Sequence, residues 1–119
     1  MKSFLRSFRY AFAGIAYVLR TQRNARVHAG VAGLVIVAGV YFRVTAVEWA
    51  ILALTMVVVF SAEMINTVAE LAVDLLTQRF HPLAKIAKDA GAGAVLLAAL
   101  AAVAVGVAIF GPRVWELLF

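Results

Sequence analysis

The sequence has no cysteine and few charged residues. Without cysteine, the chain can form no disulfide, thiolate nucleophile, iron–sulfur cluster or zinc–thiolate site. Only 14% of the 119 residues are charged, whereas 66% are hydrophobic, and a typical soluble domain has about 25% charged residues. So short a chain cannot bury this much apolar surface inside itself. Lipid or a partner chain must therefore cover the remainder.

Motifs of soluble nucleotide-using enzymes are also missing. The chain contains no GxxxxGK[ST] phosphate loop and no HRD or DFG kinase signature. The glycines of Gly91-Ala92-Gly93 lead into an apolar helix, which favours tight helix packing over phosphate binding. The basic segment Met1–Arg26 lacks the continuous apolar core of a signal peptide, so we expect no cleaved leader.

Three apolar segments have the composition of membrane-spanning helices. We assign them to residues 27–43, 47–76 and 82–110. The helix from Trp49 to Leu76 would be about 42 Å long, so one end should project beyond the ~30 Å hydrocarbon core. Pro82 suits the first position of the third helix, and Gly111-Pro112 is expected to end that helix.

The basic residues predict the orientation in the membrane. Nine of the eleven lie before the first apolar segment or between Leu76 and Ala90, where the apolar stretch of the third segment begins. By the positive-inside rule, the N-terminus and the Leu76–Lys88 connection lie in the cytoplasm and the C-terminus lies outside. The net charge of +5 then suits an anionic membrane surface, and we expect no nucleic-acid partner.

The segment Ser3–Arg20 has apolar residues at helical spacing, with basic residues largely off that face. This pattern predicts an amphipathic helix lying on the cytoplasmic leaflet, the alternative being a disordered basic tail. No internal repeat or linker divides the chain. We therefore expect a single all-α membrane domain over 1–119, with an interfacial helix and basic segment in 1–26 and three transmembrane helices.

The second apolar segment carries an unexpected polar face. At about 100° per residue, four of its side chains fall within roughly an 80° arc: Glu63, Asn66, Glu70 and Asp74. Ionisable groups at membrane depth are costly and are functional candidates by default. Because a lone three-helix chain should not shield this face, we expect a partner subunit to cover it.

The polar face leaves three functions open. Carboxylates can bind Mg²⁺ together with substrate phosphates, and a free carboxylate can accept a proton from a hydroxyl. With Lys85 and Lys88-Asp89 on the same side, these groups suit phosphoryl transfer from a nucleotide to a lipid alcohol. A cation pathway, or polar contacts between helices of an assembly, would use a similar face.

Other ionisable residues need no chemical role. His28 begins the first span beside basic residues, which is typical of an interfacial position. His81 precedes Pro82 and is expected at a helix start. Glu48 and Glu116 lie on the outer side.

The stretch from Ala62 to Asp74 closely resembles the signature E-x-x-N-[ST]-x-x-E-x-x-x-D of the prokaryotic diacylglycerol kinase family. Ala87-Lys88-Asp89, followed by Ala92-Gly93-Ala94-Val95, resembles the second motif of that family. The N-terminal region resembles its Gram-positive branch, whose members mostly act as undecaprenol kinases: Ser7-Phe8-Arg9-Tyr10-Ala11-Phe12, Gly14, Arg23-Asn24 and Arg26-Val27-His28. The resemblance covers nearly the whole chain.

The resemblance implies a homotrimer in the bacterial inner membrane, with active sites shared between subunits. It implies transfer of the γ-phosphoryl group of ATP, with Mg²⁺, to the hydroxyl of undecaprenol, or alternatively of diacylglycerol, at the cytoplasmic interface. Glu63 matches the catalytic base, Glu70 the metal-binding carboxylate and Asn66 the amide beside them. Asp74 matches a structural carboxylate. A small channel or assembly subunit that kept the fold is the non-enzymatic alternative.

Residues outside the polar face complete the implied site. Lys88 and Asp89 match nucleotide contacts, and Tyr10 matches an aromatic residue near the nucleotide. Gln22 stands where the family usually has a second metal-binding glutamate. Its amide oxygen can still coordinate Mg²⁺ but brings no charge, so we expect weaker metal binding there.

Overall fold

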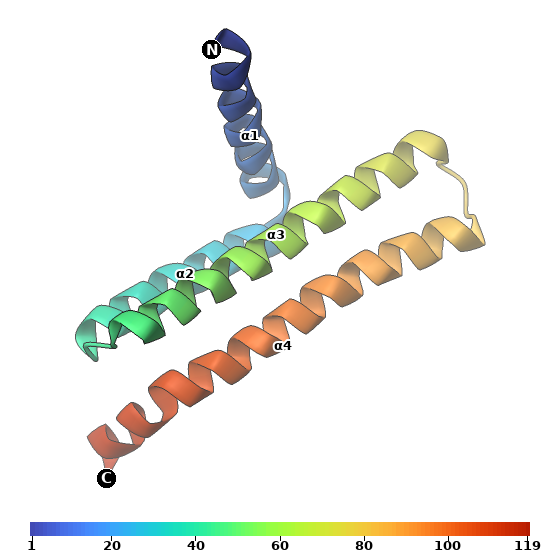
Figure 1. Cartoon of the computed structure of the whole chain (residues 1–119). Coiled ribbons are helices and arrows are strands. Elements are labelled where there is room, and N and C mark those ends of the chain that lie inside the picture. The colour runs from blue at the N-terminus through green and yellow to red at the C-terminus, as the bar shows by residue number, and fades with distance from the viewer.

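The computed structural model describes residues 1–119 as four α-helices (Figure 1). These are α1 (Lys2–Thr21), α2 (Arg23–Tyr41), α3 (Ala46–Leu76) and α4 (Pro82–Leu118). α3 packs along α4 on one side and against α2 on another, and α1 leaves this group at a steep angle. The molecule is flat, with extents of 56 × 43 × 21 Å.

The predicted all-α class is confirmed, and α2, α3 and α4 are each long and apolar enough to span a membrane. The 31 residues of α3 and the 37 residues of α4 give lengths of about 46 and 55 Å, so both exceed a hydrocarbon core of ~30 Å. α2 begins at Arg23, so the last basic residues before the first apolar segment already belong to this helix. The helix predicted over Ser3–Arg20 is α1; its position on the leaflet remains a prediction.

The turn between α2 and α3 is closed by local hydrogen bonds. Thr45 Oγ1 accepts from the backbone N–H of Glu48, while the Glu48 carboxylate accepts from the N–H of Thr45. This reciprocal cap satisfies two backbone donors at the start of α3. Arg43, with φ of 54°, supplies the reversal of chain direction. Gly39 lies against the Trp49 indole, where a Cβ would overlap the ring.

The start of α4 is as predicted, and its end is not. Pro82 is the first residue of α4, and His81 Nδ1 accepts from the N–H of Leu83. The prediction that Gly111-Pro112 ends the helix is wrong, because α4 continues through Pro112 to Leu118. Proline removes one backbone donor and crowds the preceding turn. Arg113 Nη1, one residue later, donates to the carbonyl of Ile109 at 2.6 Å.

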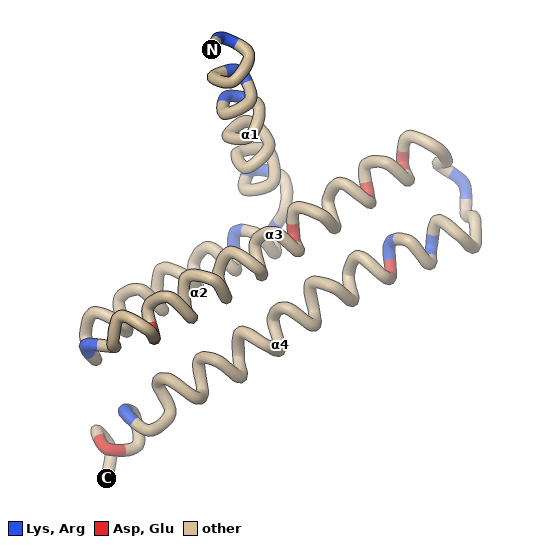
Figure 2. The backbone as a smooth tube through the Cα atoms, in the orientation of Figure 1, with Lys and Arg blue, Asp and Glu red and all other residues tan.

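The core is small and lies where the α2–α3 turn meets the end of α4. Val44, Leu52 and Ile109 form it, and only 10 of the 119 residues are buried. Large apolar side chains are exposed along every helix. The long middle stretch of α4 has no charged residue, whereas α3 has Glu63 near its middle (Figure 2). A surface of this kind requires lipid or other chains around it.

Candidate functional site

Glu63 is the most buried large side chain of the protein. It lies near the middle of α3 and is only 2% exposed. Its Oε1 atom is buried and accepts no hydrogen bond, and His28 Nε2 of α2 lies 3.5 Å from this oxygen. The expectation that a partner subunit must shield the whole polar face is therefore wrong for Glu63, which its own chain covers.

His28 makes a contact that its place in the sequence did not predict. Its side chain is 24% exposed, and it faces the buried carboxylate from the first turns of α2. A histidine next to a span start is ordinarily interfacial, and nothing in the helical period of α2 identifies the neighbour that it meets on α3. The imidazole can donate a hydrogen bond to a carboxylate from Nε2.

Asn66 and Glu70 form a second pair on the same face of α3. Asn66 Nδ2 donates to Glu70 Oε1 at 3.5 Å, while Asn66 Oδ1 is buried and accepts no hydrogen bond. Gly91 of α4 makes room for this amide, because a Cβ at Gly91 would overlap Asn66 Oδ1. The tight packing predicted for Gly91-Ala92-Gly93 is confirmed at Gly91, whereas a Cβ at Gly93 would meet nothing within 4 Å.

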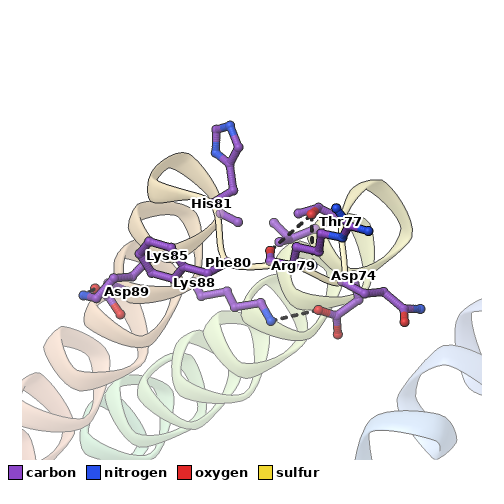
Figure 3. A pocket seen from close by; sticks show the side chains of 11 residues that line it. Asp74, Thr77, Arg79, Phe80, His81, Lys85, Lys88 and Asp89 are labelled. Atoms are coloured by element: carbon purple, nitrogen blue, oxygen red, sulfur yellow. Dashed lines mark hydrogen bonds and ion pairs between the residues drawn. The ribbon is translucent and has the colours of Figure 1, made fainter.

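Two ion pairs lie at the connection between α3 and α4. Lys88 Nζ of α4 donates to Asp74 Oδ1 of α3 at 2.8 Å, and Lys85 Nζ donates to Asp89 Oδ2 at 2.6 Å within α4. Figure 3 shows the Lys88–Asp74 pair bridging the two helices. Because all four side chains are 43–63% exposed, a nucleotide phosphate could compete for either lysine.

These ion pairs line an open pocket of ≈ 440 Å³. Arg79 and His81 join Lys85 and Lys88 in its wall, and Asp74 and Asp89 are the acidic residues. The side chains come from the end of α3, the start of α4 and the connection between them (Figure 3). A pocket with this excess of cationic groups suits an anion such as a phosphate chain.

Tyr10 and Gln22 lie apart from this group within the single chain. Tyr10 is 68% exposed on α1. Gln22 forms the corner between α1 and α2, and its side chain donates to Thr21 Oγ1 at 3.3 Å. Neither residue hydrogen-bonds to a side chain of α3. Arg26 holds the corner, because its Nη1 donates to the carbonyls of Leu19 and Arg20 at 3.2 and 2.8 Å.

The carboxylate and amide oxygens of the site are suited to bind a divalent cation weakly. No group of three or more His, Cys, Asp or Glu side chains is gathered in the chain. Mg²⁺ is ordinarily bound by one or two carboxylates together with substrate phosphates and water. The part-buried Glu70, with the orphaned Asn66 Oδ1 beside it, fits that pattern, whereas the Gln22 side chain hydrogen-bonds to Thr21 and not to Glu70.

Two known proteins match most of this chain. The chain is 49% identical over 113 residues to the diacylglycerol kinase of Synechocystis sp., covering 94% of this chain and 65% of that protein. It is 42% identical over 113 residues to the undecaprenol kinase of Bacillus subtilis, covering 95% of this chain and 92% of that protein. The chain thus spans just under two thirds of the length of the Synechocystis protein.

The family comparison covers every element of the site. The family described as prokaryotic diacylglycerol kinase matches residues 9–110, which include most of α1, all of α2 and α3, and α4 as far as Phe110. The buried Glu63, the Asn66–Glu70 pair and the pocket around Lys88 all lie within this match. The chain belongs to the prokaryotic diacylglycerol kinase family.

Proposed function

We propose that this protein is a lipid kinase that transfers the γ-phosphoryl group of ATP to the hydroxyl of undecaprenol, with Mg²⁺, at the cytoplasmic face of the bacterial inner membrane. The observation that carries the proposal is the buried Glu63 carboxylate, to which no group of the chain donates a hydrogen bond. A carboxylate with free acceptor capacity inside a membrane helix is suited to take a proton from a lipid alcohol.

In the proposed reaction, Glu63 accepts the proton of the lipid hydroxyl as its oxygen attacks the γ-phosphorus. A new phosphorus–oxygen bond forms, and the bond from the γ-phosphorus to the β–γ bridging oxygen breaks. The electron pair of the broken bond leaves with ADP. Most of the catalytic gain in such transfers comes from positioning and charge stabilisation.

The pocket at the α3–α4 connection is the proposed site for the ATP phosphates. Lys88, and Lys85 beside it, would exchange their carboxylate partners for phosphate oxygens. Asp89 would then be released to contact other parts of the nucleotide. Glu70, oriented by Asn66, would hold Mg²⁺, which neutralises charge that develops on the phosphates.

A homotrimer with shared sites accounts for the position of α1. Tyr10 and Gln22 form no hydrogen bond with a side chain of α3 in their own chain, so a neighbouring subunit would bring these residues to the nucleotide and to Glu70. The exposed apolar faces of α2, α3 and α4 leave ample area for such packing. The excess of basic residues at the N-terminus and at the α3–α4 connection supports a cytoplasmic location for both.

Diacylglycerol is the second candidate acceptor. The Synechocystis relative, which is 49% identical, is named a diacylglycerol kinase. Undecaprenol is preferred because the undecaprenol kinase of Bacillus subtilis matches over 92% of its own length, and because the N-terminal residues resemble the Gram-positive branch. Both lipids present a primary alcohol at the interface, so the same groups can serve either one.

The experiment compares the two acceptors directly. Purified protein in bicelles receives Mg²⁺ and radiolabelled ATP, with undecaprenol or diacylglycerol in separate reactions, and labelled lipid is separated by chromatography. A higher kcat/KM with undecaprenol supports the proposal. A preference for diacylglycerol would support the kinase activity and contradict undecaprenol as the acceptor. If neither lipid is labelled, the kinase proposal is contradicted and the non-enzymatic alternative gains support.

A further inference from the structure

The free Oε1 atom of Glu63 is an unusual feature of so buried a group. A buried acceptor without a donor costs about 1–3 kcal/mol, and more when it is charged. Nearby donors are already engaged: Thr67 Oγ1 donates to the backbone carbonyl of Glu63 at 2.9 Å, and Asn66 Nδ2 donates to Glu70. His28 of α2 brings a further donor close to this atom, because its Nε2 lies 3.5 Å from Oε1.

The imidazole of His28 meets the chemical requirements of such a partner. Nε2 carries a proton in the neutral Nε2–H tautomer and in the imidazolium, so it can donate in either form. At 3.5 Å, the contact is longer than the usual N–H···O distance of about 2.9 Å. Hydrogen bonds between catalytic groups are often long before substrates bind and tighten in the complex.

Resting on the proposed kinase activity, we propose that His28 is a positioning residue for Glu63, donating from Nε2 to Oε1 when the substrates are bound. This hydrogen bond fixes the rotation of the carboxylate, so that the other oxygen, Oε2, receives the proton of the lipid hydroxyl. The site thereby includes the His28 imidazole of α2, which is not part of the sequence signature on α3. A His28 that served only to fill space between α2 and α3 would be replaceable by leucine.

Two substitutions separate a hydrogen-bond donor from a space-filling side chain. His28→Gln keeps an N–H donor at the reach of the imidazole Nε2, whereas His28→Leu keeps apolar volume and removes the donor. We expect His28→Leu to lower kcat about 10- to 100-fold, the factor corresponding to one hydrogen bond to a charged group, with KM for ATP and the melting temperature unchanged. We expect His28→Gln to recover most of the lost kcat.

A second measurement does not depend on activity. The infrared band of the Glu63 carboxyl group is recorded with a non-hydrolysable ATP analogue, Mg²⁺ and the lipid bound, and is identified as the band that Glu63→Gln removes. Because a donated hydrogen bond shifts such a band, we expect it to move in His28→Leu and to stay near its wild-type position in His28→Gln.

The outcomes distinguish this inference from the proposed function. An unchanged band in His28→Leu, or a kcat as low in His28→Gln as in His28→Leu, overturns the positioning role. A band that responds as expected, in a wild-type protein that phosphorylates neither lipid, supports the His28–Glu63 contact and overturns the kinase proposal alone.

Discussion

Arg113 of α4 donates two hydrogen bonds to Glu48 of α3, from Nη1 to Oε2 and from Nη2 to Oε1, each at 2.8 Å. Glu48 Oε1 also accepts from the N–H of Thr45, so one carboxylate both caps α3 and ties it to α4. The pair lies at the end of α3 opposite the Lys88–Asp74 pair, so ion pairs join the two helices at both ends. Glu48, for which no chemical role was expected, thus has a structural one.

This pair predicts a stability effect without an activity effect. Arg113→Met should lower the melting temperature in detergent by a few degrees, because a two-point hydrogen-bonded pair is lost and a part-buried carboxylate loses its partner. The kcat should not change, since the pair lies far along α3 from Glu63. Arg43→Met is the matched control, because it removes an exposed positive charge from the same end of the molecule. Equal melting temperatures for the two variants would show that the pair contributes nothing.

The close packing of Gly91 against Asn66 leads to a prediction about activity. Gly91→Ala would drive a methyl group into Asn66 Oδ1 and displace the amide that orients Glu70. We expect kcat to fall by about tenfold or more, as is common when a group supporting a catalytic ligand is disturbed. Phosphorylation of the preferred lipid under saturating ATP measures the change.

Gly93→Ala is the control for that substitution. A Cβ at Gly93 meets nothing within 4 Å, and alanine is favoured over glycine inside a helix by roughly 0.5–1 kcal/mol. The kcat of Gly93→Ala should equal that of the wild type. Should both alanine variants keep full activity, the close approach of α4 to Asn66 has no part in the chemistry.

Much of this site follows from helical periodicity alone. The period of 3.6 residues places Glu63, Asn66 and Glu70 on one face of a helix, and α3 contains all three as a continuous helix. The same period predicted the helix that is now α1. These features are local, because each depends only on the spacing of residues within one helix.

The contacts between helices could not be predicted in this way. Which side chain meets Glu63 depends on how α2 is rotated and shifted against α3, and the sequence of α2 alone does not specify that. The Arg113–Glu48 pair likewise depends on how α4 is rotated and shifted against α3, which neither sequence specifies. The error at Pro112 has a different origin. Proline ends helices reliably in soluble proteins, but a proline is tolerated inside a membrane helix, and α4 continues through Pro112 to Leu118.

The corner residue Gln22 predicts a change in metal dependence. Gln22→Glu should lower the Mg²⁺ concentration that gives half-maximal activity, because a carboxylate binds this ion more strongly than an amide. A titration of activity against Mg²⁺ at fixed ATP measures the shift. Asn24→Asp, which adds the same charge two residues away, controls for general electrostatic attraction. If both variants shift the titration equally, or neither does, Gln22 is not a ligand.

The central claim is that Glu63 accepts the proton of the lipid hydroxyl, and the kcat of Glu63→Gln tests it most directly. Glutamine keeps the size of the side chain and removes the base, so lipid phosphorylation should fall by about 10²- to 10⁴-fold. Melting temperature and oligomer yield should match those of the wild type and of the control Glu116→Gln, which changes an exposed carboxylate. A Glu63→Gln protein with wild-type kcat, or one that unfolds or dissociates, would contradict the account.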